Sequence, residues 1–158
     1  MSWFASNYWP ALKAVIAAAW PDVQPGRLRM DTSIERIDWA QRWNDGELAP
    51  PWVTVQIDFA PTTEWCCGIV YQVDVTIWYI CKLASAPAGM TASSFIADKL
   101  FDLVGALLGA QTLGTVEDGI PIDISAENAI NVSFLDAKLP LQAGNLRASC
   151  IVAIPLEG

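Results

Sequence analysis

Histidine is absent from this chain of 158 residues, and charged residues make up only 16% of it. Without an imidazole, no serine or cysteine nucleophile can be activated by a histidine base, which excludes the triad and dyad hydrolases. The sequence also lacks a glycine-rich phosphate loop, a dinucleotide fingerprint and a Gly-x-Ser-x-Gly elbow. These absences predict a protein that is not an enzyme.

Basic residues are scarce, since nine Lys and Arg stand against seventeen Asp and Glu, a formal charge of −8. Such a surface repels nucleic-acid phosphates, so specific DNA binding is not expected. Hydrophobic residues make up 53%, which argues against disorder and favours one folded domain over residues 1–158. No apolar run is long enough to span a bilayer, and Lys13 is the first positive charge, so we expect a cytoplasmic origin and no membrane partner.

Cysteine is limited to four positions, which also bears on metal binding. Adjacent Cys66 and Cys67 would point to opposite faces of a strand and could not readily hold one ion. Cys81 and Cys150 lie in apolar runs and are interpreted as small buried side chains. With no histidine and no pair of Cys-x-x-Cys motifs, neither a metal site nor a cofactor is expected, and reduced thiols are predicted.

The strongest pattern that is present runs from 67 to 108. Apolar side chains at Val73, Val75, Ile77 and Tyr79 alternate with more polar neighbours, the two-residue period of a strand with one buried face. A breaker segment at 85–89 then leads to an amphipathic helix. Thr91 is placed to cap the start of this helix, and Gly109 is predicted to cap its end.

The rest of the chain supplies another helix and more strands. Pro10 opens a helix with a possible cap at Asn7, and Pro21 ends it. Confident strands are predicted at 52–58 and 146–154, and shorter ones at 27–30, 112–116 and 129–134. The remaining segments at 60–63, 119–122 and 140–145 are predicted to be connections or turns. The predicted fold is α+β, with a mainly antiparallel sheet and two principal helices packed on one face.

Residues 32–43 satisfy two patterns at once. Thr32 and Glu35 have capping-box spacing, and Gly46 could close a helix. Yet Ile37, Trp39 and Trp43 alternate with charged neighbours, as in a strand that approaches a hairpin turn. The helix is favoured slightly, and the alternative stays open.

Two groups of carboxylates were considered as chemical sites. Asp58, Glu64 and Asp74 flank one predicted hairpin, and a carboxylate pair can act as acid and base when burial separates the pKa values. Side chains on the solvent face of strands are the favoured interpretation. A second acidic group fits no calcium loop and is interpreted as a solvated loop; its members are Glu117, Asp118, Asp123 and Glu127.

Eight tryptophans are many for a chain of this size. Trp20, at a helix end, and Trp78, in the long strand, are predicted to lie in the core or on the sheet. Large amphipathic rings are also common anchors in protein interfaces. Four tryptophans that flank polar loops or a hairpin connection are the predicted partner contacts: Trp39, Trp43, Trp52 and Trp65.

The order and length of these elements resemble the tail terminator, or tail completion, proteins of long-tailed bacteriophages and related particles. The resemblance covers most of the chain, although that family has no diagnostic motif and this chain has a longer, Trp-rich segment at 32–51. It is carried by residues 12–20, 51–58, 71–81, 95–108 and 146–154.

The resemblance implies a virion protein, assembled in the host cytoplasm, that forms a hexameric ring at the head-proximal end of the tail tube. Its implied partners are other copies of itself, the tail tube protein and the head-tail connector or neck protein. DNA would pass through the lumen without specific binding. Two alternatives remain: a head-tail connector or neck subunit, and a binding module that uses tryptophan to hold a glycan or another ligand.

Overall fold

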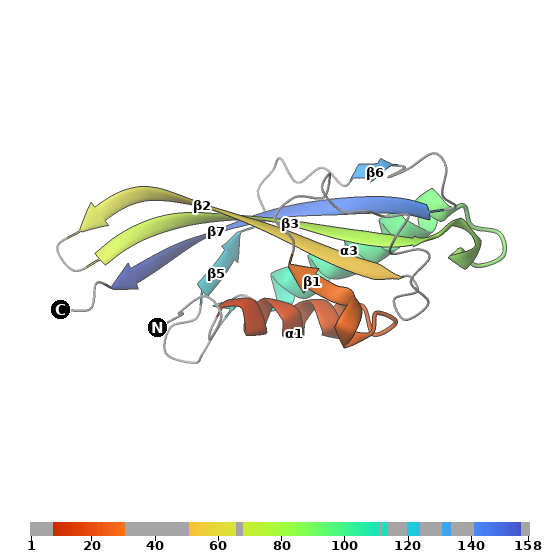
Figure 1. Cartoon of the computed structure of the whole chain (residues 1–158), viewed down its shortest axis with the longest axis horizontal. Helices are drawn as coiled ribbons and strands as arrows, with labels where there is room; N and C mark the ends of the chain where they lie inside the picture. Colours follow the sequence, from red (N-terminus) through yellow and green to blue (C-terminus); the bar gives the residue numbers. More distant parts are fainter. Residues whose placement is uncertain are drawn as a thin grey trace.

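The computed structural model describes residues 8–30, 51–65, 68–110, 112–113, 120–123, 131–133 and 141–155. Over these residues, two helices cover one face of a long, twisted and mainly antiparallel sheet (Figure 1). The helices are α1 (Trp9–Ala19) and α3 (Ala92–Ala110). The predicted α+β fold is therefore confirmed.

Three long strands make up the middle of the sheet. β3 (Gly68–Lys82) lies between β2 (Trp52–Trp65) and β7 (Leu141–Pro155) and is antiparallel to both. Shorter strands extend the two edges, in the order β1-β2-β3-β7-β5-β4, and a further strand, β6, also pairs with β7. The shorter strands are β1 (Leu28–Met30), β4 (Thr112–Leu113), β5 (Ile120–Asp123) and β6 (Asn131–Ser133). β1 is parallel to β2.

α1 begins and ends as the sequence predicts. Pro10 stands in its first turn, where the missing N–H removes no intrahelical hydrogen bond. Leu12 and Ile16 lie one turn apart and are both buried, which fixes the face that packs inward. The helix closes at Trp20, whose backbone N–H donates to the carbonyl oxygen of Ile16. The proposed cap at Asn7 lies outside the described residues.

α3 is capped at its start by Thr91, as predicted. The hydroxyl oxygen of Thr91 accepts a hydrogen bond of 3.1 Å from the backbone N–H of Ser94, which satisfies one free donor of the first turn. The predicted end at Gly109 is wrong, because the helix continues to Ala110. A C-terminal glycine is needed only where the backbone turns left-handed, and among the described glycines this occurs at Gly89, with φ of 88°, before the helix.

The core lies between the helices and one face of the sheet. Pairing places Val55, Ile77 and Leu146 in one row across β2, β3 and β7, all of them buried. The predicted alternation along β3 is confirmed, since exposed Asp74 lies between buried Val73 and Val75. The helices contribute the other half of this cluster, with the side chains Leu12, Ile16, Ile96, Leu100, Leu103 and Leu107.

Three predicted connections belong to strands instead. Residues 60–63 continue β2 with a register shift between Pro61 and Thr63, residues 141–145 begin β7, and residues 120–122 lie in β5. In each segment, hydrogen bonding to a long neighbouring strand overrides the local turn signal of proline or glycine. The short strands predicted at 27–30, 112–116 and 129–134 are confirmed in part by β1, β4 and β6. Residues 32–43 lie outside the described part of the chain.

Replacing Val75 by aspartate tests the buried face. Val75 is buried among the apolar side chains beneath the helices, and a carboxylate there would have no partner. We expect Val75→Asp to lower the free energy of unfolding by roughly 3 kcal/mol or more, enough to prevent soluble expression. Arg147→Asp adds the same side chain at an exposed position of β7 and should express normally. Normal urea unfolding of Val75→Asp would contradict the assigned face.

Candidate assembly surface

A three-stranded arm extends the sheet beyond the helix-covered core. We define the arm as residues 60–65 of β2, 68–72 of β3 and 151–155 of β7, which pair from Ala60, Gln72 and Ile151 to Trp65, Gly68 and Pro155 at the tip. In Figure 1 these strands run on past the ends of both helices. The five residues of β3 in the arm span about 16 Å at the usual rise of a strand.

Both edges of the arm lack a strand partner among the described residues. β1 pairs with β2 only at residues 53–55, and β5 pairs with β7 only at Ser149 and Cys150. The backbone donors and acceptors on the outer sides of residues 60–65 and 151–155 are therefore not used by any strand that the structure describes. Such an edge is a template for pairing with another strand.

The four tryptophans predicted as partner contacts are not brought together. Trp52 begins β2 and is only 2% exposed, so the expectation that it is accessible on this chain is wrong. Its row in the sheet also holds Ile80 and Ala143, both buried, so the ring is part of the interior. Trp65 ends β2 at the tip of the arm. Trp39 and Trp43 lie outside the described residues.

The carboxylates of the central hairpin face solvent. Asp58 and Asp74 are directly paired across β2 and β3, and both are exposed. The amide of Gln72 donates a hydrogen bond of 3.1 Å to the Asp74 carboxylate. An open sheet face does not provide the burial that an acid and base pair needs, so the solvent-facing interpretation is confirmed for these two. The side chains of Glu64 and of the acidic group at 117–127 are not among those described.

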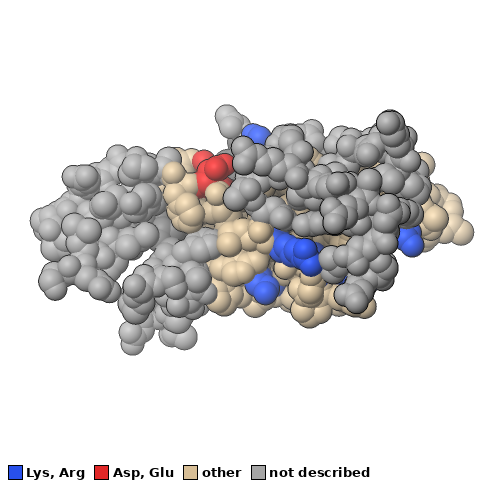
Figure 2. Space-filling view, viewed as in Figure 1, with Lys and Arg blue, Asp and Glu red and all other residues tan. Residues whose placement is uncertain are grey.

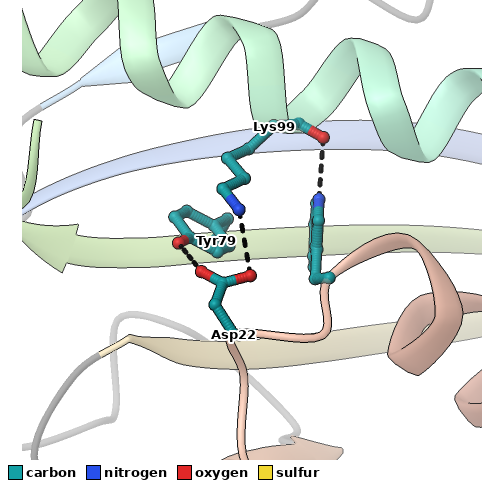
Figure 3. Close-up of polar contacts among 4 residues, drawn as sticks. Asp22, Tyr79 and Lys99 are labelled. Carbon is teal, nitrogen blue, oxygen red and sulfur yellow. Dashed lines mark hydrogen bonds and ion pairs between the residues drawn. The ribbon is translucent and has the colours of Figure 1, made fainter. Parts of the chain in front are cut away.

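A polar network joins the end of α1 to α3 and β3 (Figure 3). The Tyr79 hydroxyl donates to Oδ2 of Asp22 at 2.6 Å, and Nζ of Lys99 donates to Oδ1 at 3.0 Å. Nε1 of Trp20 donates to the backbone carbonyl oxygen of Lys99 at 2.7 Å. The Trp20 ring also meets the Tyr79 ring edge to face, with 5.0 Å between centroids. Three elements far apart in the sequence are thereby held together.

The electrostatics of this network suit a structural role. Partial burial raises the pKa of Asp22, but the hydrogen bonds from Tyr79 and Lys99 and the charge of Lys99 outweigh it, so the pKa lies below its usual value. Burial and the bond to Asp22 raise the pKa of Tyr79 above its usual range, which keeps the phenol a donor. Burial raises the pKa of the neighbouring Cys81 thiol to about 11, so this cysteine is an inert buried side chain, as predicted.

An apolar groove of about 400 Å³ lies along the outer side of α1. Its floor and walls combine helix residues with the segment that follows, and Ile16, Leu28 and Val23 are its buried members. The one charged side chain that lines it is Lys13, whose ammonium lies 5.7 Å from the centre of the Trp9 ring. The other lining residues are Trp9, Pro10, Ala14, Ile16, Ala17 and Pro25.

The groove, the network and the arm are not among the features predicted from the sequence. A signal for the groove was present, because α1 carries a single charge in eleven residues and its outward positions include Ala14 and Ala17. An exposed helix face without charges is atypical of a solvated helix. No sequence pattern predicts the network, because Asp22, Tyr79 and Lys99 are separated by up to 77 positions.

The described residues offer neither a metal site nor a helix that could span a membrane. Within the described ranges, no group of three or more Cys, Asp or Glu side chains is placed to hold a metal ion. Neither α1 nor α3, the helices that the structure describes, is long and apolar enough to cross a bilayer.

Comparison with known proteins gives a similarity to a solved structure but no match in sequence. No family model matches the chain, and no curated protein matches it. A solved structure described as the virion of a native gene transfer agent particle contains a similar chain, with 14% sequence identity and a TM-score of 0.48. The match covers 92% of this chain and 96% of the other. At that TM-score the likeness does not assign a role to this chain.

Removing the acid of the network should lower stability in a pH-dependent way. A carboxyl whose pKa is depressed by folding stabilises the protein above its unfolded pKa, and this contribution is lost as the pH falls through the folded value. We expect Asp22→Asn to cost about 1 kcal/mol at neutral pH. Because the wild type loses this contribution in acid, the two proteins should converge as the pH falls below about 4.

Urea unfolding of both proteins at a series of pH values measures this difference. Asp74→Asn is the matched control, since Asp74 is exposed, accepts a hydrogen bond from the neutral amide of Gln72 and lies opposite another acid, Asp58, so loss of its charge should not lower stability. A stability difference between wild type and Asp22→Asn that is the same at every pH would show that the carboxylate charge plays no part in the network.

Proposed function

We propose that this protein is a structural subunit of a phage or phage-like virion that forms a ring at the head-proximal end of the tail tube. The ring terminates the tail and joins it to the head connector, with DNA passing through the lumen. The observation that carries the proposal is the arm, because no strand among the described residues pairs with either of its two outer edges beyond a well-buried core. The resemblance in element order to tail terminators supports the same role.

The two edges of the arm differ, and this favours a ring. One edge belongs to β2 and the other to β7, so a contact between the β2 edge of one copy and the β7 edge of the next is head-to-tail. Head-to-tail contacts close into rings when the rotation between successive copies divides a full turn into a whole number of steps. Self-assembly of this kind requires no catalysis.

The acidic charge suits a channel for DNA. A formal charge of −8 per subunit is repeated in every copy of a ring, which gives the lumen a negative field. Phosphates would then find few cationic contacts to hold them in transit. Trp39, Trp43 and Trp65 remain the proposed contacts with tube, connector or neighbouring copies; Trp52 is withdrawn because it is buried.

The first test is the native mass of the purified protein over a concentration series, with negative-stain images of the same samples. We expect closed rings of about six subunits. If the protein stays monomeric alone, the same measurement is repeated with assembled tail tubes, and rings should appear at one end of each tube. A protein that forms no ring in either setting is not a terminator, and rings that bind the connector but not the tube would indicate a neck subunit instead.

A lysine on the β7 edge of the arm should weaken assembly without changing the fold. Ala153 of β7 pairs with Val70 of β3, and no described strand pairs with its other side; in this register it shares a face of the sheet with exposed Gln72 and Asp74. Charged side chains on an edge strand oppose pairing with another strand. Ala153→Lys should therefore shift the native mass toward monomer, with an unchanged circular dichroism spectrum.

The matched control is Ser149→Lys. Ser149 occupies the same side of β7, but it is already paired with β3 on one side and β5 on the other. This variant should assemble as the wild type does. Equal assembly of both variants would remove the β7 edge from the interface.

A further inference from the structure

α3 carries an exposed aromatic side chain flanked by acids. Phe101 is 62% exposed, the largest exposed fraction among the large hydrophobic side chains that the structure describes as exposed. Asp98 and Asp102 lie beside it on the outward side of the helix and are also exposed. We call these three residues the acidic knob. A single exposed ring needs no explanation by itself, but Asp98 and Asp102 form an acidic face one turn apart that adjoins the Phe101 ring, and an apolar surface with basic neighbours would complement it.

The groove along α1 offers that complement. It is apolar, and its charged lining residue is Lys13. Arg27 and Arg29 stand on either side of Leu28, another lining residue. Residues 8–30 thus hold three of the nine basic residues of the chain and one of its seventeen acids. That acid, Asp22, is already engaged by Lys99 and Tyr79, so the rim of the groove is cationic on an acidic protein.

Figure 2 shows this local concentration of positive charge. Lys and Arg side chains gather in the lower middle of the face, where Figure 1 draws α1 and β1. On a chain that is acidic as a whole, such a basic area would attract an acidic partner.

The knob and the groove lie on opposite flanks of the helix layer. Lys99 points from α3 toward Asp22, in the connector that follows α1. Successive residues of a helix are turned by about 100°, so Phe101 lies about 200° around the axis from Lys99. The Phe101 ring therefore points away from the α1 side of α3 and does not face the groove of its own chain, whereas Asp98 and Asp102 lie about 100° and about 60° from Lys99 on the outward face. A second copy can supply the groove.

We propose that the acidic knob of one copy docks into the α1 groove of a second copy. Phe101 enters the apolar groove, and Asp98 and Asp102 face Lys13, Arg27 and Arg29. Because knob and groove lie on opposite flanks, each copy uses its knob toward one neighbour and its groove toward the other, a head-to-tail arrangement. This contact rests on the proposed self-assembly and names a second surface for it, separate from the edges of the arm.

Paired charge reversals test the contact through loss and rescue. The knob variant carries Asp98→Lys and Asp102→Lys, and the groove variant carries Lys13→Glu and Arg29→Glu. Within either variant, knob and groove now have like charge, so association between copies should weaken at least about tenfold. In an equimolar mixture, each knob meets a groove of opposite charge, and assembly should return with the two variants alternating. Native mass spectrometry distinguishes the mixed from the uniform assemblies.

Two further variants separate docking from folding. Phe101→Ser should weaken association while leaving the thermal unfolding midpoint of the monomer nearly unchanged, because the ring is largely exposed there. Asp74→Lys reverses an acid on β3 rather than on the helix layer and should not affect assembly.

Each outcome is informative. Loss of assembly in both charge variants with recovery in the mixture supports docking of knob into groove. Wild-type rings that persist in both variants would overturn the docking while leaving the proposed ring intact. Loss without recovery in the mixture, with both variants folded, would show that the charges act elsewhere. A wild type that is monomeric alone and on tail tubes would overturn the docking and the ring together.

Discussion

The pairing of β3 with both β2 and β7 is the constraint on which the rest of the structure depends. Fifteen consecutive residues of β3, Gly68 to Lys82, are in register with β7, and nearly the same length is in register with β2. Because side chains alternate across a strand, this single register decides which residues of all three strands share a face. A shift by one residue would move Val75, Ile77 and Leu146 out of the core together.

The same long strands run through two parts of the molecule, the helix-covered core and the arm. Where the helices lie, both faces of the sheet are buried around residues such as Ile77 on one side and Trp52 on the other. Beyond the helices, the strands continue as an arm whose outer edges are not paired by any strand that the structure describes (Figure 1). Stability can thus be concentrated in one part, which leaves the arm free to pair with another chain. The helix layer adds its own surfaces, a cationic groove on α1 and an acidic knob on α3.

The Asp22 network explains how the helix layer keeps its position. α1 and α3 pack side by side through apolar side chains, and such contacts alone are tolerant of sliding. Hydrogen bonds from Tyr79 and Lys99 to one carboxylate, and from Trp20 to the α3 backbone, are directional. They fix the connector after α1 against both β3 and α3. As a result, the relative position of the two helices, and with them of the groove on α1 and the knob on α3, is fixed.

The sequence by itself determined the elements whose signals are local: the α+β class, the alternating face of β3, the Thr91 cap and the extent of α1 between Pro10 and Trp20. Only the tertiary structure decided features that depend on distant partners. Residues 60–63 and 141–145 have turn signals yet lie in strands, because β3 pairs with them. The position of Trp52 beside a polar loop in the sequence suggests a surface anchor, but the side chain is buried on the sheet. The groove and the Asp22 network each combine residues that are far apart in the chain, and the knob and the groove lie on different helices. No local sequence pattern predicts which of these residues lie close together.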